Sequence, residues 1–138
     1  MSIVQKFATA FNRQDVDGLL GCFTPTATYR DTFYGEHGGP AALRAMFERM
    51  FREGKDYRWT MDAVVESATR AAAEWTFSYV VTDVVPRSVG RHIRFRGMSL
   101  FQLEGDRIAA YREYFDKGAA LLQLGFAPAS MAKVLARG

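Results

Sequence analysis

The second half of the chain alternates between apolar and polar residues along four segments, and this pattern constrains the fold most. The segments run from Tyr57 to Glu66, Ala71 to Thr82, Arg91 to Leu103 and Arg107 to Asp116. Such alternation is typical of strands that bury one face. Gly105 and Asp106, between the last two segments, predict a tight hairpin. The sequence therefore predicts a four-stranded meander with one buried face.

Three helices are expected before the meander, because apolar residues recur there at helical spacing. The first helix carries Ile3, Phe7 and Phe11. The second follows an N-cap at Asp15 and carries Val16, Leu19, Leu20 and Phe23. The third begins at Pro40, ends at Gly54, and carries Leu43, Met46, Phe47, Met50 and Phe51.

A strand from Thr26 to Phe33 is expected between the second and third helices, and a closing helix from Gly118 to Leu124. The glycine-rich stretch from Gly35 to Gly39 is expected to be a turn that caps the third helix. Helices followed by a meander form an α+β pattern. A sheet curved around the helices would leave a pocket at its open end. We therefore expect one domain over residues 1–138, an α+β cone around an apolar pocket.

The composition agrees with a large core or a core plus an apolar cavity, because 49% of the residues are apolar and 14% are aromatic. The single Cys22 cannot form an internal disulfide, and no apolar run is long enough to span a membrane, so a cytoplasmic protein without a membrane partner is expected. Two histidines and one cysteine give no metal-ligand spacing. A basic cluster is interpreted as a solvated outer strand face and not as a nucleic-acid contact: Arg87, Arg91, His92, Arg94 and Arg96.

Odd-numbered residues are the apolar ones on every predicted strand, so this parity is expected to face the pocket. Two acids break the rule: Asp31 lies between aromatic residues on the first strand, and Glu113 lies between Tyr111 and Phe115 on the last. A buried carboxyl has a raised pKa, which suits general acid or base work. Alternatively, each acid accepts a hydrogen bond that ties a strand to a helix, or lies solvated at the pocket mouth.

Two stretches of the sequence resemble SnoaL-like proteins of the nuclear transport factor 2-like superfamily. One runs from Phe95 to Asp116 and continues from Leu121 to Phe126, and the other covers Phe7 to Phe47. The resemblance implies the cone-shaped α+β fold, a curved mixed sheet around three N-terminal helices, usually in a homodimer packed through the outer sheet face. This scaffold hosts unrelated functions, so the resemblance specifies the fold better than the reaction.

Catalytic members of the superfamily imply roles for both acids. Ketosteroid isomerase carries its general base in the pattern Ala-Thr-x-x-Asp, which the stretch ending in Asp31 matches. The Tyr and the protonated Asp of that enzyme's oxyanion hole have Phe7 and Ser99 at their positions here. Polyketide cyclases and limonene-epoxide hydrolases carry an acid on the last strand, in a motif similar to the one around Glu113.

Two functions are compatible with these observations. The first is a cofactor-independent enzyme, of isomerase, cyclase or epoxide-hydrolase type, that acts on a hydrophobic small molecule with Asp31 and Glu113 as catalytic residues. The second is a non-catalytic small-molecule binding domain. The side chains expected to contact the ligand are Phe7, Tyr29, Phe47, Trp59, Trp75, Phe95, Ser99, Tyr111 and Phe115. A third possibility is a domain that mainly dimerises, through Met98 and Leu100.

Overall fold

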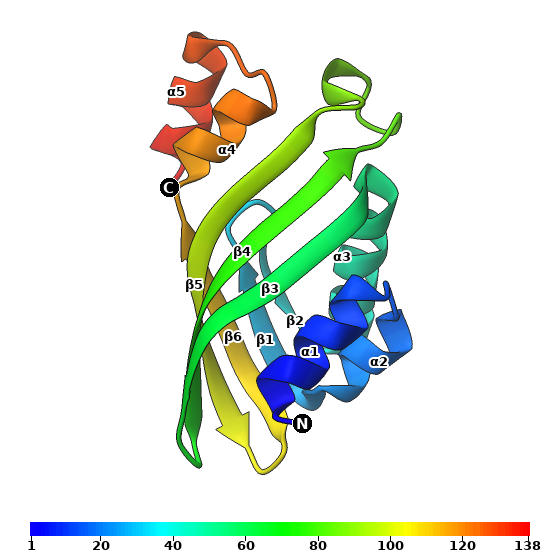
Figure 1. Cartoon of the computed structure of the whole chain (residues 1–138), viewed down its shortest axis with the longest axis vertical. Helices are drawn as coiled ribbons and strands as arrows, with labels where there is room; N and C mark the ends of the chain where they lie inside the picture. The colour runs from blue at the N-terminus through cyan, green and yellow to red at the C-terminus, as the bar shows by residue number, and fades with distance from the viewer.

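The computed structural model describes residues 1–138 and contains five α-helices, one short 3-10 helix and a six-stranded sheet (Figure 1). The elements in chain order are α1 (Ile3–Asn12), α2 (Val16–Gly21), β1 (Phe23–Asp31), β2 (Gly35–Gly38), α3 (Pro40–Glu53), β3 (Gly54–Glu66), β4 (Arg70–Val81), η1 (Pro86–Ser88), β5 (His92–Glu104), β6 (Arg107–Phe115), α4 (Lys117–Gln123) and α5 (Pro128–Ala136). None of the helices is both long enough and apolar enough to span a bilayer.

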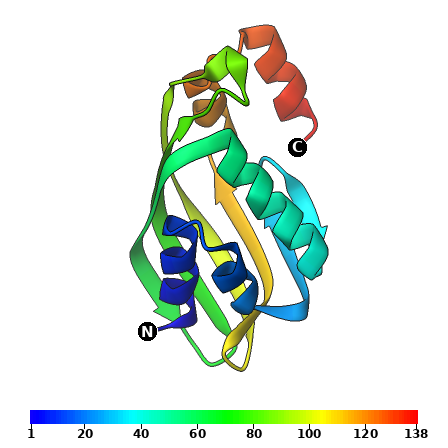
Figure 2. The same cartoon turned by 90° about the vertical axis from the view of Figure 1, so that its right-hand side faces the viewer.

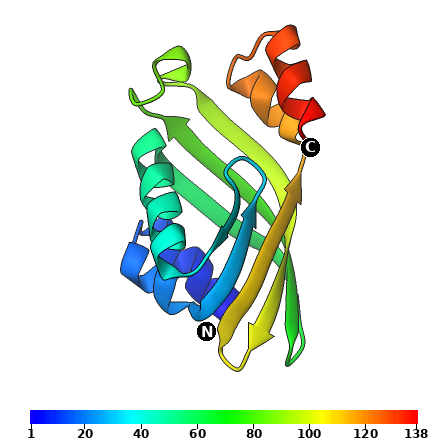
Figure 3. The same ribbon diagram turned by 180° about the vertical axis from the view of Figure 1, so that it is seen from behind.

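The sheet is mixed and strongly curved. Its strand order is β2-β1-β6-β5-β4-β3, and every neighbouring pair is antiparallel except β1 and β6, which run parallel. Helices α1, α2 and α3 lie against the inner face of the curve (Figure 2). Seen from behind, β6 runs beside β1 and leads into α4 and α5 beyond the end of the sheet (Figure 3). This arrangement confirms the predicted α+β fold.

The predicted helix starts and stops are confirmed at most positions. Asp15 caps α2, because its Oδ1 accepts a hydrogen bond of 2.9 Å from the Gly18 N–H. Pro40 is the first residue of α3, where a missing N–H costs nothing, and Gly54 is its C-cap. A capping box at Ser2, which the sequence analysis did not identify, starts α1.

Two sequence expectations about the early strands were wrong, and one C-terminal helix was not predicted. β1 starts at Phe23, which was expected on the second helix, and includes Pro25. Its pairing with β6 shifts register between Phe23 and Thr28, and such an irregularity tolerates a residue without an N–H. The expected turn at Gly35–Gly38 is strand β2, paired antiparallel with β1. Helix α5 was not predicted, and none of its residues is buried.

The inward parity is confirmed over most of the sheet and fails where two strands change register. A shift between Met61 and Ala63 turns Val65 outward, where it is 75% exposed. A second shift, where β5 meets β6, buries Ile108 in place of the expected Ala109. Each bulge adds one residue to one strand, so the parity beyond it reverses.

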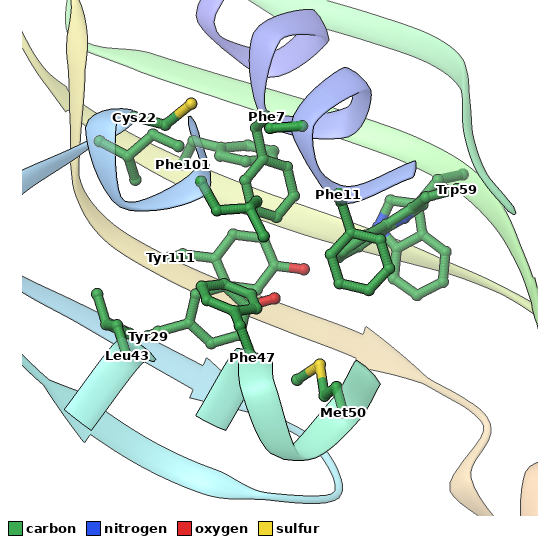
Figure 4. Packing of buried hydrophobic residues seen from close by; sticks show 14 of the residues in the cluster. Phe7, Phe11, Cys22, Tyr29, Leu43, Phe47, Met50, Trp59, Phe101 and Tyr111 are labelled. Atoms are coloured by element: carbon green, nitrogen blue, oxygen red, sulfur yellow. The ribbon is translucent and has the colours of Figure 1, made fainter. Parts of the chain in front are cut away.

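The core is dominated by aromatic rings and forms one cluster between the inner helices and the sheet. Phe7 of α1 lies at its centre, with five aromatic ring centroids 5.1 to 6.5 Å away (Figure 4). Many of these pairs meet edge to face, the geometry that the charge distribution of aromatic rings favours. The basic residues interpreted as a solvated face are all exposed: Arg87, Arg91, His92, Arg94 and Arg96.

Candidate active site

Asp31 and Glu113, the carboxyl pair of this site, lie near the ends of two strands that run parallel side by side. The register pairs Tyr29 with Tyr111 and Arg30 with Arg112, so the next inward residues are the two acids. Neighbouring strands lie about 4.8 Å apart, so the carboxyls are immediate neighbours on one face. The acids are only 7% and 9% exposed, respectively. The parity argument thus placed both side chains on the inner face of the sheet.

Asp31 is held by the backbone of the turn that follows its strand. One carboxylate oxygen, Oδ1, accepts hydrogen bonds of 2.7 Å from the Phe33 N–H and 2.8 Å from the Tyr34 N–H. Both contacts are local, since aspartate readily bonds the amides two and three residues ahead. The second oxygen, Oδ2, has no hydrogen bond within the protein, so it is the atom that can exchange a proton with a ligand.

Glu113 ends a chain of buried hydrogen bonds that crosses three strands. The Trp75 Nε1–H donates to the Ser99 Oγ over 2.7 Å, and the Ser99 hydroxyl donates to the Tyr111 Oη over 2.8 Å. The Tyr111 hydroxyl then donates to the Glu113 Oε1 over 2.7 Å. Because an indole N–H can only donate, the chain runs in one direction and leads to the carboxyl. It fixes the orientation of Glu113.

The opposite carboxyl oxygen of Glu113 is tied to the first strand. Its Oε2 accepts a hydrogen bond of 3.2 Å from the Thr32 N–H, next to Asp31 in the sequence. The Thr32 hydroxyl also donates to the Glu113 backbone oxygen over 3.4 Å. These hydrogen bonds connect the end of β6 to the turn after β1, so both carboxyls are positioned by paired backbone segments.

Both acids have pKa values well above the ordinary carboxyl range. Burial raises the pKa of Asp31 to about 6, against the opposing effect of its two backbone hydrogen bonds. Burial, followed by repulsion from Asp31, raises the pKa of Glu113 to about 8. The two values differ partly because the residues are neighbours, since the Asp31 charge adds to the effect of burial on Glu113, and a separation of this kind is the pattern of a paired acid and base.

No basic side chain forms an ion pair with either acid. His37 on β2 and Lys117 on α4 face Asp31 and lower its pKa through space, but desolvation outweighs them. The sequence left open whether each acid simply accepts a hydrogen bond that ties a strand to a helix. Glu113 accepts hydrogen bonds from Tyr111 on its own strand and from the Thr32 amide, and Asp31 accepts only from the amides of the turn after its strand, so neither acid is tied to a helix. The structure excludes an ion pair for both, and Asp31 keeps one carboxylate oxygen without a partner.

The carboxyl pair lies in the wall of a cavity between the inner helices and the sheet. Fourteen residues line it, and apart from the acids and one methionine all are aromatic: Phe11, Tyr29, Asp31, Phe33, Tyr34, Met50, Tyr57, Trp59, Trp75, Phe77, Tyr79, Phe95, Glu113 and Phe115. The cavity has a volume of only about 40 Å³. That is room for a few water molecules, so a ring system would have to displace side chains.

Five of the nine residues expected to contact a ligand line this cavity: Tyr29, Trp59, Trp75, Phe95 and Phe115. Phe7 and Phe47 are fully buried in the core behind it. Ser99 and Tyr111 also lie outside the lining, where they carry the hydrogen-bond chain to Glu113. Cavity residues and core residues were therefore grouped together, because strand parity and helical apolar stripes identify a buried face but not whether that face lines a cavity.

Several lining residues were not singled out from the sequence. Tyr57, Phe77 and Tyr79 share the inward parity, and Phe11 and Met50 lie on the apolar stripes of α1 and α3, so a signal existed for each. Distinguishing cavity from core, however, depends on which end of each strand faces the helices.

The indole N–H of Trp59 has no hydrogen-bond partner within the protein, so the cavity wall includes one hydrogen-bond donor without an acceptor. No three side chains of metal-ligand type gather anywhere in the structure.

The sequence profile of the SnoaL-like domain matches residues 4–111. The chain belongs to the SnoaL-like family. The match includes Asp31 and ends two residues before Glu113. No curated protein matches the sequence of this SnoaL-like protein significantly.

Solved structures share the fold of this SnoaL-like protein at low sequence identity. A protein with a ketosteroid isomerase-like fold from Catenulispora acidiphila, in complex with trimethylamine, is 17% identical, with a TM-score of 0.79, over 91% of this chain and 93% of that one. A polyketide cyclase-type protein from Silicibacter sp. is 23% identical, with a TM-score of 0.78, over 88% and 91%. An epoxide hydrolase from M. tuberculosis is 15% identical, with a TM-score of 0.73, over 99% and 94%. These likenesses establish the nuclear transport factor 2-like fold.

Proposed function

We propose that this SnoaL-like protein is a cofactor-independent enzyme that moves a proton on a small, largely apolar molecule held in the aromatic cavity. The observation that carries the proposal is the carboxyl pair: two neighbouring buried acids without ion-pair partners in the wall of the cavity. Their pKa values lie on either side of neutrality, so one can accept a proton while the other donates one. Structural relatives named as a polyketide cyclase-type protein and an epoxide hydrolase are consistent with small-molecule chemistry.

Asp31 is the base in this mechanism. Near neutral pH it is mostly ionised, and its Oδ1 is fixed by two backbone amides while Oδ2 is free to take a proton from an activated carbon or from water. The two amide bonds keep the carboxylate oriented during the transfer. Removal of the proton leaves negative charge on the substrate, on an enolate oxygen for example, and this charge has to be stabilised.

Glu113 is the acid in this mechanism. With a pKa of about 8 it keeps its proton near neutral pH and donates it to the substrate oxygen on which charge develops. Such a carboxylic acid fulfils the role of an oxyanion-hole donor, which Phe7 and Ser99 do not offer, since one is apolar and the hydroxyl of the other is committed to Tyr111. Asp31 then returns its proton to a carbon of the substrate while Glu113 takes back the proton from the enol oxygen, so both groups are restored.

The pH dependence of turnover tests this assignment. On a panel of enones, epoxides and polyketide-type substrates, we expect kcat/KM to rise as Asp31 loses its proton at about 6 and to fall as Glu113 loses its proton at about 8. The Glu113→Gln variant should lose the falling limb, because glutamine does not titrate. The Glu74→Gln variant, on the exposed outer face, should keep both limbs. A falling limb that persists in Glu113→Gln would refute the role of Glu113.

A non-catalytic binding domain is the second candidate, and the narrow cavity favours it. Space for only a few water molecules is suited to holding a compact group. The Catenulispora acidiphila protein of the same fold was solved in complex with trimethylamine, which is such a group. Binding without turnover predicts that ligands raise the melting temperature and are recovered unchanged.

The outer face of the sheet and the single cysteine bear on how the protein assembles and where it is located. We propose a homodimer packed through the outer face of the sheet, where Met98 is 50% exposed and Leu100 is half-buried. A cytoplasmic location is consistent with a single buried thiol at Cys22. Sedimentation that finds only monomer at micromolar concentration would contradict the dimer.

A further inference from the structure

We propose that the group recognised by the cavity is a compact organic cation, a methylated ammonium, carried by the substrate or ligand. This inference rests on the proposed function, because it assumes that the cavity is the ligand site. It adds the chemical class of the ligand, which the assignment of acid and base leaves open. Charge, aromatic content and size support it independently.

The charge of the lining favours a cation. Among the fourteen lining residues there is no lysine, arginine or histidine, whereas two are carboxylic acids. A third acid, Glu53, lies just outside and accepts the Tyr34 hydroxyl over 2.6 Å. No basic group belongs to the lining. Arg49 pairs with Glu53 and lies over the Tyr34 ring, with its guanidinium carbon 4.9 Å from the ring centroid. His37 and Lys117 approach Asp31 without an ion pair. A buried carboxylate without a partner is compensated best by a ligand of opposite charge.

The aromatic content of the lining distinguishes a cation site from a general apolar pocket. Eleven of the fourteen lining residues are aromatic, and none is leucine, isoleucine or valine. An apolar ligand would be bound as well by aliphatic side chains, whereas the face of an aromatic ring attracts a cation. Trp59 and Trp75, of the residue type that gives the strongest attraction of this kind, are both buried members of the lining. Tyr57 and Tyr79, both half-buried, also belong to it.

The size of the cavity limits the cation. Because its volume is only about 40 Å³, the cavity suits a group of a few heavy atoms better than a fused ring system. Most carboxyl oxygens of the lining already accept hydrogen bonds from the protein. Asp31 Oδ1 accepts from two amides, and the Glu113 oxygens accept from Tyr111 and Thr32. A methylated nitrogen has few or no N–H groups that would need such acceptors, so it suits this lining. The remaining oxygen, Asp31 Oδ2, supplies the counter-charge.

A matched pair of ligands tests the inference. Choline and its uncharged isostere 3,3-dimethyl-1-butanol have the same shape and hydroxyl group, and differ only in the charged nitrogen. Titrated into the full chain by calorimetry, with tryptophan fluorescence as a second readout, choline should bind at least about tenfold more tightly than the isostere. Asp31→Asn should weaken choline by at least about tenfold and leave the isostere unchanged, while Glu74→Gln should bind both as the wild type does.

The outcomes separate this inference from the proposed function. If the isostere binds as tightly as choline, or choline does not bind, the ligand is not a cation and the inference is overturned. The proposed acid and base are then still tested by the pH dependence of turnover on uncharged substrates. If choline is preferred but the pH profile lacks both limbs, the cation site stands and the catalytic assignment fails. A melting temperature of Asp31→Asn that is no lower than that of the wild type excludes misfolding as a cause of lost binding.

Discussion

Replacing Asp31 by asparagine is expected to lower kcat by about 10²- to 10⁴-fold, the contribution of a positioned general base. Asparagine keeps the side-chain shape and the oxygen that accepts the Phe33 and Tyr34 amides, so the turn after β1 should stay intact. It cannot accept a proton from the substrate, so the loss should appear in kcat more than in KM. The measurement is steady-state turnover of any substrate that the wild type converts.

Two variants control this result. Thr32→Ala removes a hydroxyl that contacts only the Glu113 backbone oxygen, so it should change kcat little although it lies next to Asp31. Glu113→Gln should slow turnover as well, since it removes the acid. Because the two carboxyls act in one step, the double variant should be little worse than the more damaging single variant. Turnover that is unchanged in Asp31→Asn would eliminate this residue as the base.

The second large effect is on stability, which is expected to fall by several kcal/mol between about pH 4 and about pH 8. Each folded-state pKa lies above its unfolded value: Asp31 moves from 3.8 to about 6, and Glu113 from 4.5 to about 8. At a pH between the unfolded-state and folded-state pKa values of these acids, the folded chain binds more protons than the unfolded chain. The free energy of unfolding therefore decreases as pH rises. This contribution to stability is fully present at a pH below the unfolded-state pKa values, and it is lost as pH rises through the folded-state pKa values.

Urea unfolding across this pH range measures the effect, with neutral variants as the comparison. The double variant Asp31→Asn, Glu113→Gln contains no buried charge to desolvate, so its free energy of unfolding should lack most of this decrease. It should therefore be more stable than the wild type at about pH 9, a sign that the wild type sacrifices stability for a functional site. Equal pH slopes in the two proteins would show that the carboxyls are not desolvated.

The sequence was informative about this fold wherever one residue type decides the local geometry. Pro40 and Gly54 delimit α3, and Gly105 with Asp106 forms the hairpin between β5 and β6. The inward parity placed Asp31 and Glu113 on the inner face, because side chains alternate strictly along an extended strand. These features are determined by the conformational preferences of neighbouring residues, so they could be predicted from the sequence.

Features that depend on pairing between distant strands were not predictable in the same way. The parallel register that sets Asp31 beside Glu113 joins segments 82 residues apart, and no local signal encodes it. Bulges reversed the parity at Val65 and Ile108, because an added residue in one strand is specified by its partner. The separation of cavity from core likewise depends on how the helices cover the sheet, so Phe7 and Phe47 were grouped with residues that line the cavity.

Direct titration of the two side-chain carboxyls by carbon-13 NMR probes the buried, unneutralised carboxyl pair with no substrate needed. Asp31→Asn and Glu113→Gln assign the two signals. We expect the Asp31 carboxyl to titrate at about 6 and the Glu113 carboxyl at about 8, and the Glu113 value to fall when Asp31 is replaced, because its repulsion is removed. Two carboxyls that titrate at about 4, as solvated acids do, or lower, as ion-paired acids do, would contradict this account.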